Sequence, residues 1–209
     1  MNQTAILLER LSALLQQSVR DDAAGHGLLP IHLQVLHYLA RANRYSDLPI
    51  AIAEYFGITR GTVSQTLQVL ERKGLLTKKP DPQHGKRVHL QLTAAARRVL
   101  QQTWAERVVP LPEELPPPML ALENTLRTLL LTMQRINGRR AFGICHECIH
   151  FLTEASGHRC GLTGEVLADE QTLRICREWT APATRAAIGK RVKPATAASQ
   201  PAPRRPRRA

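Results

Sequence analysis

The sequence predicts a mainly α fold with a small β-wing (α+β): a winged helix-turn-helix with long N- and C-terminal helices, a small four-cysteine appendage and a disordered tail. Three observations support this prediction. Apolar residues recur at helical spacing at both ends of residues 1–140, a glycine turn between two short helical segments precedes a hairpin pattern, and all four cysteines fall within residues 141–180. We expect these two ranges to form separate domains and residues 181–209, rich in Pro, Ala and Arg, to be disordered.

Apolar periodicity predicts the first two helices. Leu7, Leu11 and Leu14 recur at spacings of three and four residues, which places an apolar stripe on one face of a first helix. Gly25 interrupts the pattern, and Pro30 stands where a second helix begins, because proline is favoured in the first helical turn. The second helix carries apolar residues on more than one side, so we expect it to be mostly buried.

A tight glycine turn joins the next two predicted helices. The first runs from about residue 48 to 56 and ends at Gly57, and Thr59 can cap the second through its side-chain oxygen. Gly74 then occupies the position of a left-handed C-cap. Two short helices in this arrangement form a helix-turn-helix. The second helix has an apolar face made of Val63, Leu67 and Leu70.

A hairpin follows the second of these helices directly. Residues 75–79 and 87–92 read as two short strands, and the segment between them has the Pro, Asp and Gly content of a turn. We therefore predict a β-hairpin wing. Thr93 can cap a further helix that continues to about Val108, where several prolines end it.

A last long helix begins at Met119 and carries an apolar stripe like that of the first helix. Terminal helices with matching stripes commonly bury them against a symmetry mate, although packing within the same chain is the alternative. We expect a homodimer, which would set two reading heads one helical turn of DNA apart. The stripe consists of Leu122, Leu126, Leu129, Leu130 and Met133.

The net charge of +12 is unevenly distributed along the chain. Residues 59–93 carry seven basic side chains and two acidic ones, while residues 181–209 carry eight basic side chains and no acid. Positive charge is thus concentrated where contact with the phosphates of a nucleic acid would need it. Taken alone, such an excess could also be an ordinary solvated surface.

The predicted recognition helix carries polar and basic side chains opposite its apolar face. Gln65 and Gln68 can make paired hydrogen bonds to adenine, and Ser64 can reach a base edge or a phosphate. A helix amino terminus favours phosphate, and a cationic hairpin tip suits a narrow minor groove. We predict that double-stranded DNA is contacted by Arg60, Gly61, Thr62, Ser64, Gln65, Gln68, Arg72 and Lys73 on the helix and by Lys86 and Arg87 on the wing.

The chain resembles the MarR (multiple-antibiotic-resistance regulator) family of winged-helix repressors over about residues 1–137. The resemblance rests on residues 48–58, on Thr62-Val63-Ser64-Gln65-Thr66-Leu67 with Leu70-Glu71-Arg72-Lys73-Gly74-Leu75, and on Val88-His89-Leu90-Gln91-Leu92-Thr93. It implies a homodimer joined by its terminal helices that binds a pseudo-palindromic operator. It also implies release by a small-molecule or redox effector, with repression as the favoured mode of regulation.

The four cysteines follow the pattern C-x2-C-x11-C-x15-C, and the chain has no other cysteine. Four thiolates suit a tetrahedral zinc ion or an iron–sulfur cluster, and the two-residue gap lets two sulfurs face one ion. We favour structural zinc, with an iron–sulfur cluster and free thiols as alternatives. The predicted ligands are Cys145, Cys148, Cys160 and Cys176, and the nearby His146, His150 and His158 are expected to be solvated or supporting residues.

Other classes of protein fit the sequence less well. The alternative function is an RNA-binding or protein-adaptor winged-helix protein with a structural zinc site, but three Phe and three Tyr offer little stacking surface for single strands. An enzyme is not expected, because no phosphate-binding Gly-rich loop, nucleophile elbow or H-E-x-x-H motif is present. Without a signal-like or membrane-spanning segment, we expect a cytoplasmic protein.

Overall fold

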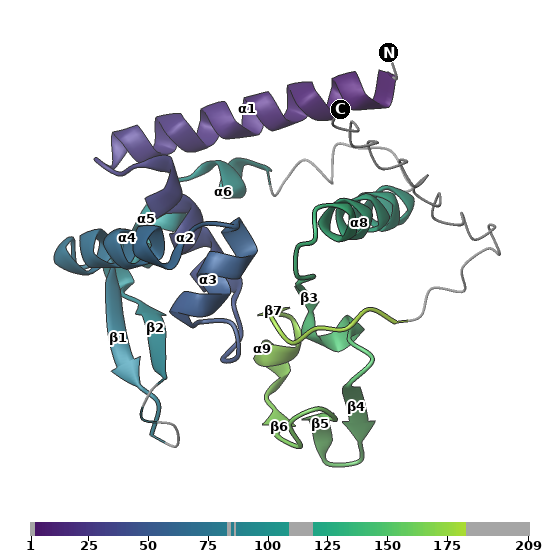
Figure 1. The fold of residues 1–209 in the computed structure, drawn as a ribbon. Helices are drawn as coiled ribbons and strands as arrows, with labels where there is room; N and C mark the ends of the chain where they lie inside the picture. The colour runs from purple at the N-terminus through teal and green to yellow at the C-terminus, as the bar shows by residue number, and fades with distance from the viewer. Residues whose placement is uncertain (1–2, 83–84, 86, 109–118, 183–209) are drawn as a thin grey trace, which may run out of the picture.

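The computed structural model describes residues 3–82, 85, 87–108 and 119–182. The described helices are α1 (Gln3–Gly25), α2 (Pro30–Arg41), α3 (Pro49–Phe56), α4 (Arg60–Arg72), α5 (Ala94–Leu100), α6 (Trp104–Val108), α8 (Met119–Ile136) and α9 (Asp169–Thr172), with a 3-10 turn η1 (Cys145–Glu147). The described strands are β1 (Leu76–Pro80), β2 (Val88–Leu92), β3 (Gly143–Ile144), β4 (Phe151–Glu154), β5 (Gly157–Cys160), β6 (Val166–Leu167) and β7 (Ile175–Cys176). The predicted mainly helical fold with a small wing is confirmed (Figure 1). Of the predicted tail, residues 181–209, all but the first two residues lie outside the described part of the chain.

Helix α2 forms the centre of the main hydrophobic core, as its two-sided apolar pattern predicts. It contacts α1, α4, α5 and β2, and its Leu33, Val35 and Leu36 are fully buried. Tyr38 is also buried, and its hydroxyl donates a 2.8 Å hydrogen bond to the backbone oxygen of Ser46. That bond satisfies the polar end of an otherwise apolar side chain, so the loop after α2 is held against the core.

The turn between α3 and α4 forms as the sequence predicts. Gly57 has φ 64°, in the left-handed region that favours glycine, and its N–H donates to the oxygen of Ala53. The Thr59 side chain accepts a 3.1 Å hydrogen bond from the N–H of Thr62 and so caps α4. The helix-turn-helix is therefore set by local interactions on both sides of the turn.

The wing is an antiparallel hairpin of β1 and β2. Its register runs from Leu76 opposite Leu92 to Pro80 opposite Val88, so the strands match the predicted ones to within a residue. Leu76 and Leu90 are buried and anchor the base of the hairpin on the core. Residues 83, 84 and 86 near its tip lie outside the described part of the chain.

The predicted continuous helix from Thr93 to Val108 is wrong, because the chain breaks it into α5 and α6. Thr103 is fully buried between them and donates a hydrogen bond to the oxygen of Leu100, while the His37 ring lies 3.1 Å from the same hydroxyl. The N–H of Trp104 donates to the Asp22 carboxylate of α1. These partners satisfy the new helix ends and stabilise the break.

The cysteine segment is docked on the winged-helix domain. Its Phe142 and Ile175 belong to the main hydrophobic core, and the N–H of Asn43, just after α2, donates to the oxygen of Ile175 at 2.9 Å. Strands β3 and β7 form one two-stranded sheet, and β4, β5 and β6 form a small antiparallel sheet. A second apolar cluster, which contains Leu167 and Trp179, lies inside the segment.

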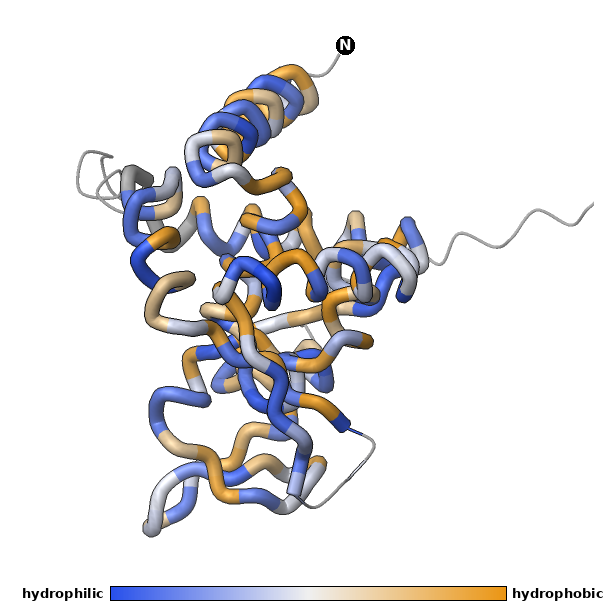
Figure 2. The backbone as a smooth tube through the Cα atoms, turned by 90° about the vertical axis from the view of Figure 1, so that its left-hand side faces the viewer, coloured by the Kyte–Doolittle hydropathy of each residue, from blue (hydrophilic) through white to orange (hydrophobic). Residues whose placement is uncertain are grey.

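Helices α1 and α8 keep much of their apolar stripes exposed. Figure 1 shows the amino-terminal part of α1 extending past the winged-helix core toward the side on which α8 lies, and Figure 2 shows hydrophobic and hydrophilic residues alternating along α1. None of the helices described combines the length and apolar content that a membrane span requires. The exposed stripe residues are Leu7, Leu11, Leu14 and Leu15 in α1 and Leu122, Leu126, Leu130, Met133 and Ile136 in α8.

Candidate nucleic-acid interface and cysteine cluster

Helix α4 has one buried face and one exposed face. Val63, Leu67 and Leu70 are buried against the core, as predicted. A Cβ atom at Gly61 would meet no atom closer than the Thr59 hydroxyl at 3.7 Å, so packing within the described residues does not require a glycine there. Eight of the predicted DNA-contacting residues are exposed on or next to this helix: Arg60, Gly61, Thr62, Ser64, Gln65, Gln68, Arg72 and Lys73.

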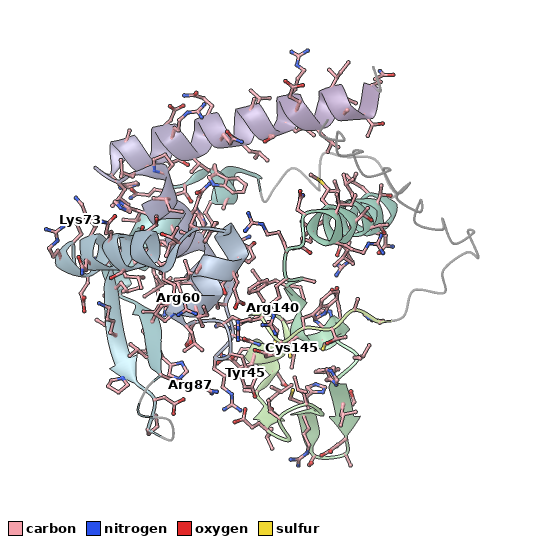
Figure 3. The ribbon with its side chains drawn as sticks, viewed as in Figure 1. Tyr45, Arg60, Lys73, Arg87, Arg140 and Cys145 are labelled. Carbon is pink, nitrogen blue, oxygen red and sulfur yellow. The ribbon has the colours of Figure 1, made fainter. Side chains whose placement is uncertain are left out.

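The wing adds cationic side chains beside α4. Arg87 is exposed just before β2, whereas the predicted contact Lys86 lies outside the described residues. Lys78 makes a 2.7 Å ion pair with Glu71 of α4, which ties the hairpin to the helix. Figure 3 shows Arg60 and Lys73 at the two ends of α4 and Arg87 on the wing.

A hollow of about 450 Å³ opens between α3, α4 and the wing. It is mostly apolar and holds two basic side chains, Arg60 and Lys78. Its size falls within the range of small-molecule pockets. The lining residues are Pro49, Ile50, Arg60, Val63, Ser64, Leu67, Lys78 and Val88.

His89 joins the wing to the loop before α3, which sequence reasoning did not find. Its Nδ1 lies 2.6 Å from Asp47 and its Nε2 lies 3.3 Å from Asp81. Burial lowers the pKa of His89, but the hydrogen bonds and charges of the two carboxylates outweigh burial and raise it overall. Asp47 is 42 residues away in sequence, so no local spacing signals this pair.

The four predicted cysteines come together in the fold. Cys145 and Cys148 bracket η1, Cys160 ends β5 and Cys176 ends β7, and all four line one cavity of about 10 Å³. Of the three nearby histidines, the structure places His150 in the lining of this cavity. All four cysteines are free of disulfide bonds. The cavity has about the space that one water molecule or one ion needs.

The four sulfurs lie close enough to influence one another, and without a bound ion the thiolate forms of Cys145 and Cys176 are disfavoured. Burial, followed by the charges of the other three cysteines, raises the pKa of Cys145 to about 11, so four uncompensated thiolates would repel each other. Burial also raises the pKa of Cys176, against the side chain of Asn43 and the backbone of Glu178, which favour its thiolate. The backbone N–H of Thr180 lies 3.3 Å from the Cys148 sulfur.

A buried asparagine, Asn43, lies near the cysteine cluster on the side of the winged-helix domain. It is 2% exposed, and its amide nitrogen has no hydrogen-bond partner among the described atoms, although it influences Cys176. An N–H group placed beside a ligand sulfur is the usual supporting contact of a thiolate site. Across the described part of the chain, no three Cys, His, Asp or Glu side chains already stand in an ion-binding arrangement. The donor set therefore fits a metal, while the sulfurs would have to close around it.

The helix-turn-helix and the wing together define a winged-helix fold. Residues 26–87 match the model of the MarR family, which agrees with the resemblance seen in the residues of α4 and the wing. No curated protein matches the chain significantly.

Solved structures of other proteins are similar to part of this chain at low sequence identity. A MarR transcriptional regulator from Methanosarcina mazei Go1 is 15% identical, with a TM-score of 0.51 over 64% of this chain and 97% of that one. MepR from S. aureus in complex with DNA is 20% identical, with a TM-score of 0.49 over 64% and 99%. CouR from Rhodococcus jostii RHA1 bound to p-coumaroyl-CoA is 18% identical, with a TM-score of 0.48 over 65% and 92%. The shared part leaves about a third of this chain unmatched.

Proposed function

We propose that this protein is a sequence-specific transcriptional regulator that binds double-stranded DNA as a homodimer. The observation that carries the proposal is the exposed polar face of α4, with Ser64, Gln65 and Gln68, beside a cationic wing in a segment that matches the MarR family. Nothing acidic interrupts this face between Arg60 and Gln68. Such a surface can enter a major groove, where donor and acceptor patterns distinguish the bases.

Each part of the surface has its own role in the proposal. Gln65 and Gln68 read adenine through paired hydrogen bonds, while Arg60, Arg72 and Lys73 hold phosphates and fix the register. Arg87 supports the wing in or beside the minor groove. Phosphate contacts supply affinity that falls with salt, and base contacts supply the sequence preference.

The proposed dimer rests on the exposed apolar stripes of α1 and α8. The exposed leucines of these two helices leave apolar area in contact with water. Burial of that area in a dimer would contribute about 25 cal/mol of free energy per Å². A two-fold dimer would also bring two α4 helices to successive major grooves, about 34 Å apart. A DNA-binding regulator of this kind would act in the cytoplasm.

The test uses a duplex selected from a random library against the full-length protein. In mobility shifts at rising salt, Gln65→Ala and Gln68→Ala should each weaken binding to that duplex about 5- to 150-fold and relax its sequence preference, the effect expected for one lost base contact of about 1–3 kcal/mol. Arg72→Ala should weaken binding to all duplexes alike and reduce the salt dependence.

Gln101→Ala serves as the matched control, because this exposed glutamine lies after α5 and outside the proposed surface. It should bind the selected duplex like the unmodified protein. Loss of affinity in this control equal to that in Gln65→Ala, or a protein that ignores duplex DNA, would contradict the proposal. Preferential binding of single-stranded RNA would favour the RNA-binding alternative instead.

We further propose that Cys145, Cys148, Cys160 and Cys176 hold one zinc ion. Their convergence on one small cavity, the backbone N–H of Thr180 beside the Cys148 sulfur and the buried Asn43 amide near Cys176 support this. A cavity of about 10 Å³ has room for one ion and would have to widen for an iron–sulfur cluster. Protein purified without oxygen should be colourless with one zinc per chain; a brown protein with iron and sulfide, or one without metal, would contradict zinc.

An effector completes the proposal. The hollow between α3, α4 and the wing offers a place for a small molecule, and the cysteine cluster offers a metal- or redox-dependent one. The hollow lies against α3, α4 and the wing, and Tyr45 from the loop before α3 lines the cysteine cavity, so occupation of either could change DNA binding. A ligand in the hollow would contact Ser64 and Arg60 directly and compete with DNA for them.

A further inference from the structure

The cysteine cluster and the DNA-reading head meet at two consecutive residues, Cys176 and Arg177. Cys176 lines the cysteine cavity and is 7% exposed. The backbone N–H of Arg177 donates a 2.7 Å hydrogen bond to the hydroxyl of Ser46, in the loop between α2 and α3. The Arg177 guanidinium binds both oxygens of Glu54 on α3, at 2.6 and 2.8 Å. A proposed metal ligand, Cys176, is thus directly bonded to Arg177, the residue that binds α3 of the helix-turn-helix.

The ion pair between Arg177 and Glu54 has the features of a strong one. It is bidentate, and its side chains are only 18% and 27% exposed. Arg140 and Glu178 extend it into a network, which lowers the pKa of Glu54 chiefly through its hydrogen bonds to Arg177. Paired, partly buried geometry of this kind holds more firmly than a lone surface pair. Figure 3 shows Arg140 and Cys145 where the cysteine segment meets the reading head.

Helix α3 depends on such outside contacts. It has eight residues, and its N-cap Leu48 offers no side-chain hydrogen bond to the first turn. A helix this short has little stability of its own, so its position is set by what packs against it. Glu54, near its carboxyl end, is held by Arg177 from the cysteine segment.

The loop of residues 42–48 carries the connection on to the wing. On one side, the backbone N–H of Asn43 donates to the oxygen of Ile175, the residue before Cys176, and the Asn43 side chain accepts a 2.8 Å hydrogen bond from the hydroxyl of Ser46. On the other side, the backbone oxygen of Asp47 accepts the N–H of Leu90 in β2 at 2.9 Å, and its carboxylate contacts His89. The same short loop therefore touches both the strand that ends in Cys176 and the base of the wing.

We infer that metal occupancy of the cysteine cluster controls DNA binding through the Cys176–Arg177 pair. This inference rests on the proposed function. With the ion bound, Cys176 is fixed and Arg177 holds Glu54 and Ser46, so α3 and the wing stay in the arrangement described above. When the ion leaves, the segment around Cys176 loosens, Arg177 releases Glu54, and the reading head loses order that DNA binding must then restore. The metal-loaded protein therefore binds DNA more tightly.

The test compares zinc-loaded full-length protein with protein stripped by a chelator under reducing conditions, on a duplex selected with the zinc-loaded form. Stripping should weaken DNA binding about 5- to 150-fold, the range typical of coupling between two sites, and DNA should raise zinc affinity by the same factor. Arg177→Gln should still bind one zinc, but the ratio between its loaded and stripped affinities should fall close to one. Hydrogen exchange at residues 42–56 should rise on stripping in the unmodified protein.

Arg159→Gln is the matched control, because this arginine of β5 pairs with Glu154 of the same small sheet. It should keep the full ratio. Glu54→Gln removes the α3 partner of the same ion pair. It should also bring the ratio between loaded and stripped affinities close to one, which tests the inference even if Arg177→Gln folds poorly.

The possible results distinguish failure of this inference from failure of the proposed function. Protein that binds both zinc and duplex but shows no change in DNA affinity on stripping, or an Arg177→Gln variant that matches Arg159→Gln, overturns the inference and leaves the proposed function standing. Protein that binds neither zinc nor duplex overturns the proposed function and the inference with it.

Discussion

The winged-helix head buries a contiguous apolar core around α2, whereas the cysteine segment buries little more than Leu167 and Trp179 beside two of its own cysteines. The strands of the head pair over five residues, and those of the segment have two to four. Burial of apolar area alone can stabilise the first region, but so small a core cannot stabilise the second. A region of the second kind usually depends on a cross-link, and four converging thiols can supply one through a metal.

The largest expected effect is therefore the loss of the cysteine segment when its ion is removed. Structural zinc contributes on the order of 10–16 kcal/mol to the folding of small zinc modules. In Cys160→Ser, or in protein treated with a chelator, we expect bound zinc to be lost and amide hydrogens of residues 143–176 to exchange rapidly. Amides of α2 should stay protected, because the core of the head persists.

Ser156→Ala is the control for this experiment, since Ser156 is an exposed residue of the turn between β4 and β5. It should retain both zinc and slow exchange. If the segment stays protected without metal, docking on the head through Phe142 and Ile175 suffices to fold it, and the contrast between the two regions fails.

The two regions also differ in how far sequence predicts them. The turn at Gly57, the cap at Thr59 and the apolar face of α4 follow from residues a few positions apart, so the helix-turn-helix could be predicted from the sequence. The cysteine spacing likewise predicted a cluster, and the fold brings the four residues to one cavity.

Contacts between distant segments could not be predicted in this way. The break at Thr103 depends on His37 and on Asp22, and the joint between Glu54 and Arg177 spans 123 residues. The sequence around Arg177 does not indicate that its partner is Glu54. For that reason the sequence predicts the cysteine segment as a separate appendage, whereas in the structure Phe142 and Ile175 of this segment pack into the core of the winged-helix domain.

Acid should weaken the head by a route that does not involve the cysteines. His37 is 8% exposed, and burial, followed by the charge of Arg41 and opposed by Asp22, lowers its pKa to about 4 from 6.5. Between pH 6.5 and about pH 4, His37 is protonated in the unfolded chain but not in the folded domain. The free energy of unfolding therefore falls over this range, by about 3 kcal/mol in all. Urea unfolding of the head at pH 7 and pH 4 measures this loss.

His37→Gln removes the titrating group and can keep a hydrogen bond with Thr103. Its stability should depend less on pH between 7 and 4 than that of the unmodified protein. Gln101→Ala, at an exposed position after α5 that does not titrate, should keep the full pH dependence. An identical acid response in His37→Gln would assign the loss to other groups.

The smallest of these effects concerns a single helix cap and distinguishes stability from reading. Thr59→Ala removes the side-chain oxygen that accepts the N–H of Thr62 and should lower the stability of the head by about 1 kcal/mol. Thr93→Ala removes the equivalent cap from α5 and should cost a similar amount. Only the first change frays the amino terminus of α4, so only Thr59→Ala should also weaken DNA binding in the mobility-shift assay. Zinc content should be unchanged in both, because neither cap contacts the cysteine segment, and equal losses of DNA affinity in the two variants would mean that α4 is not the reading helix.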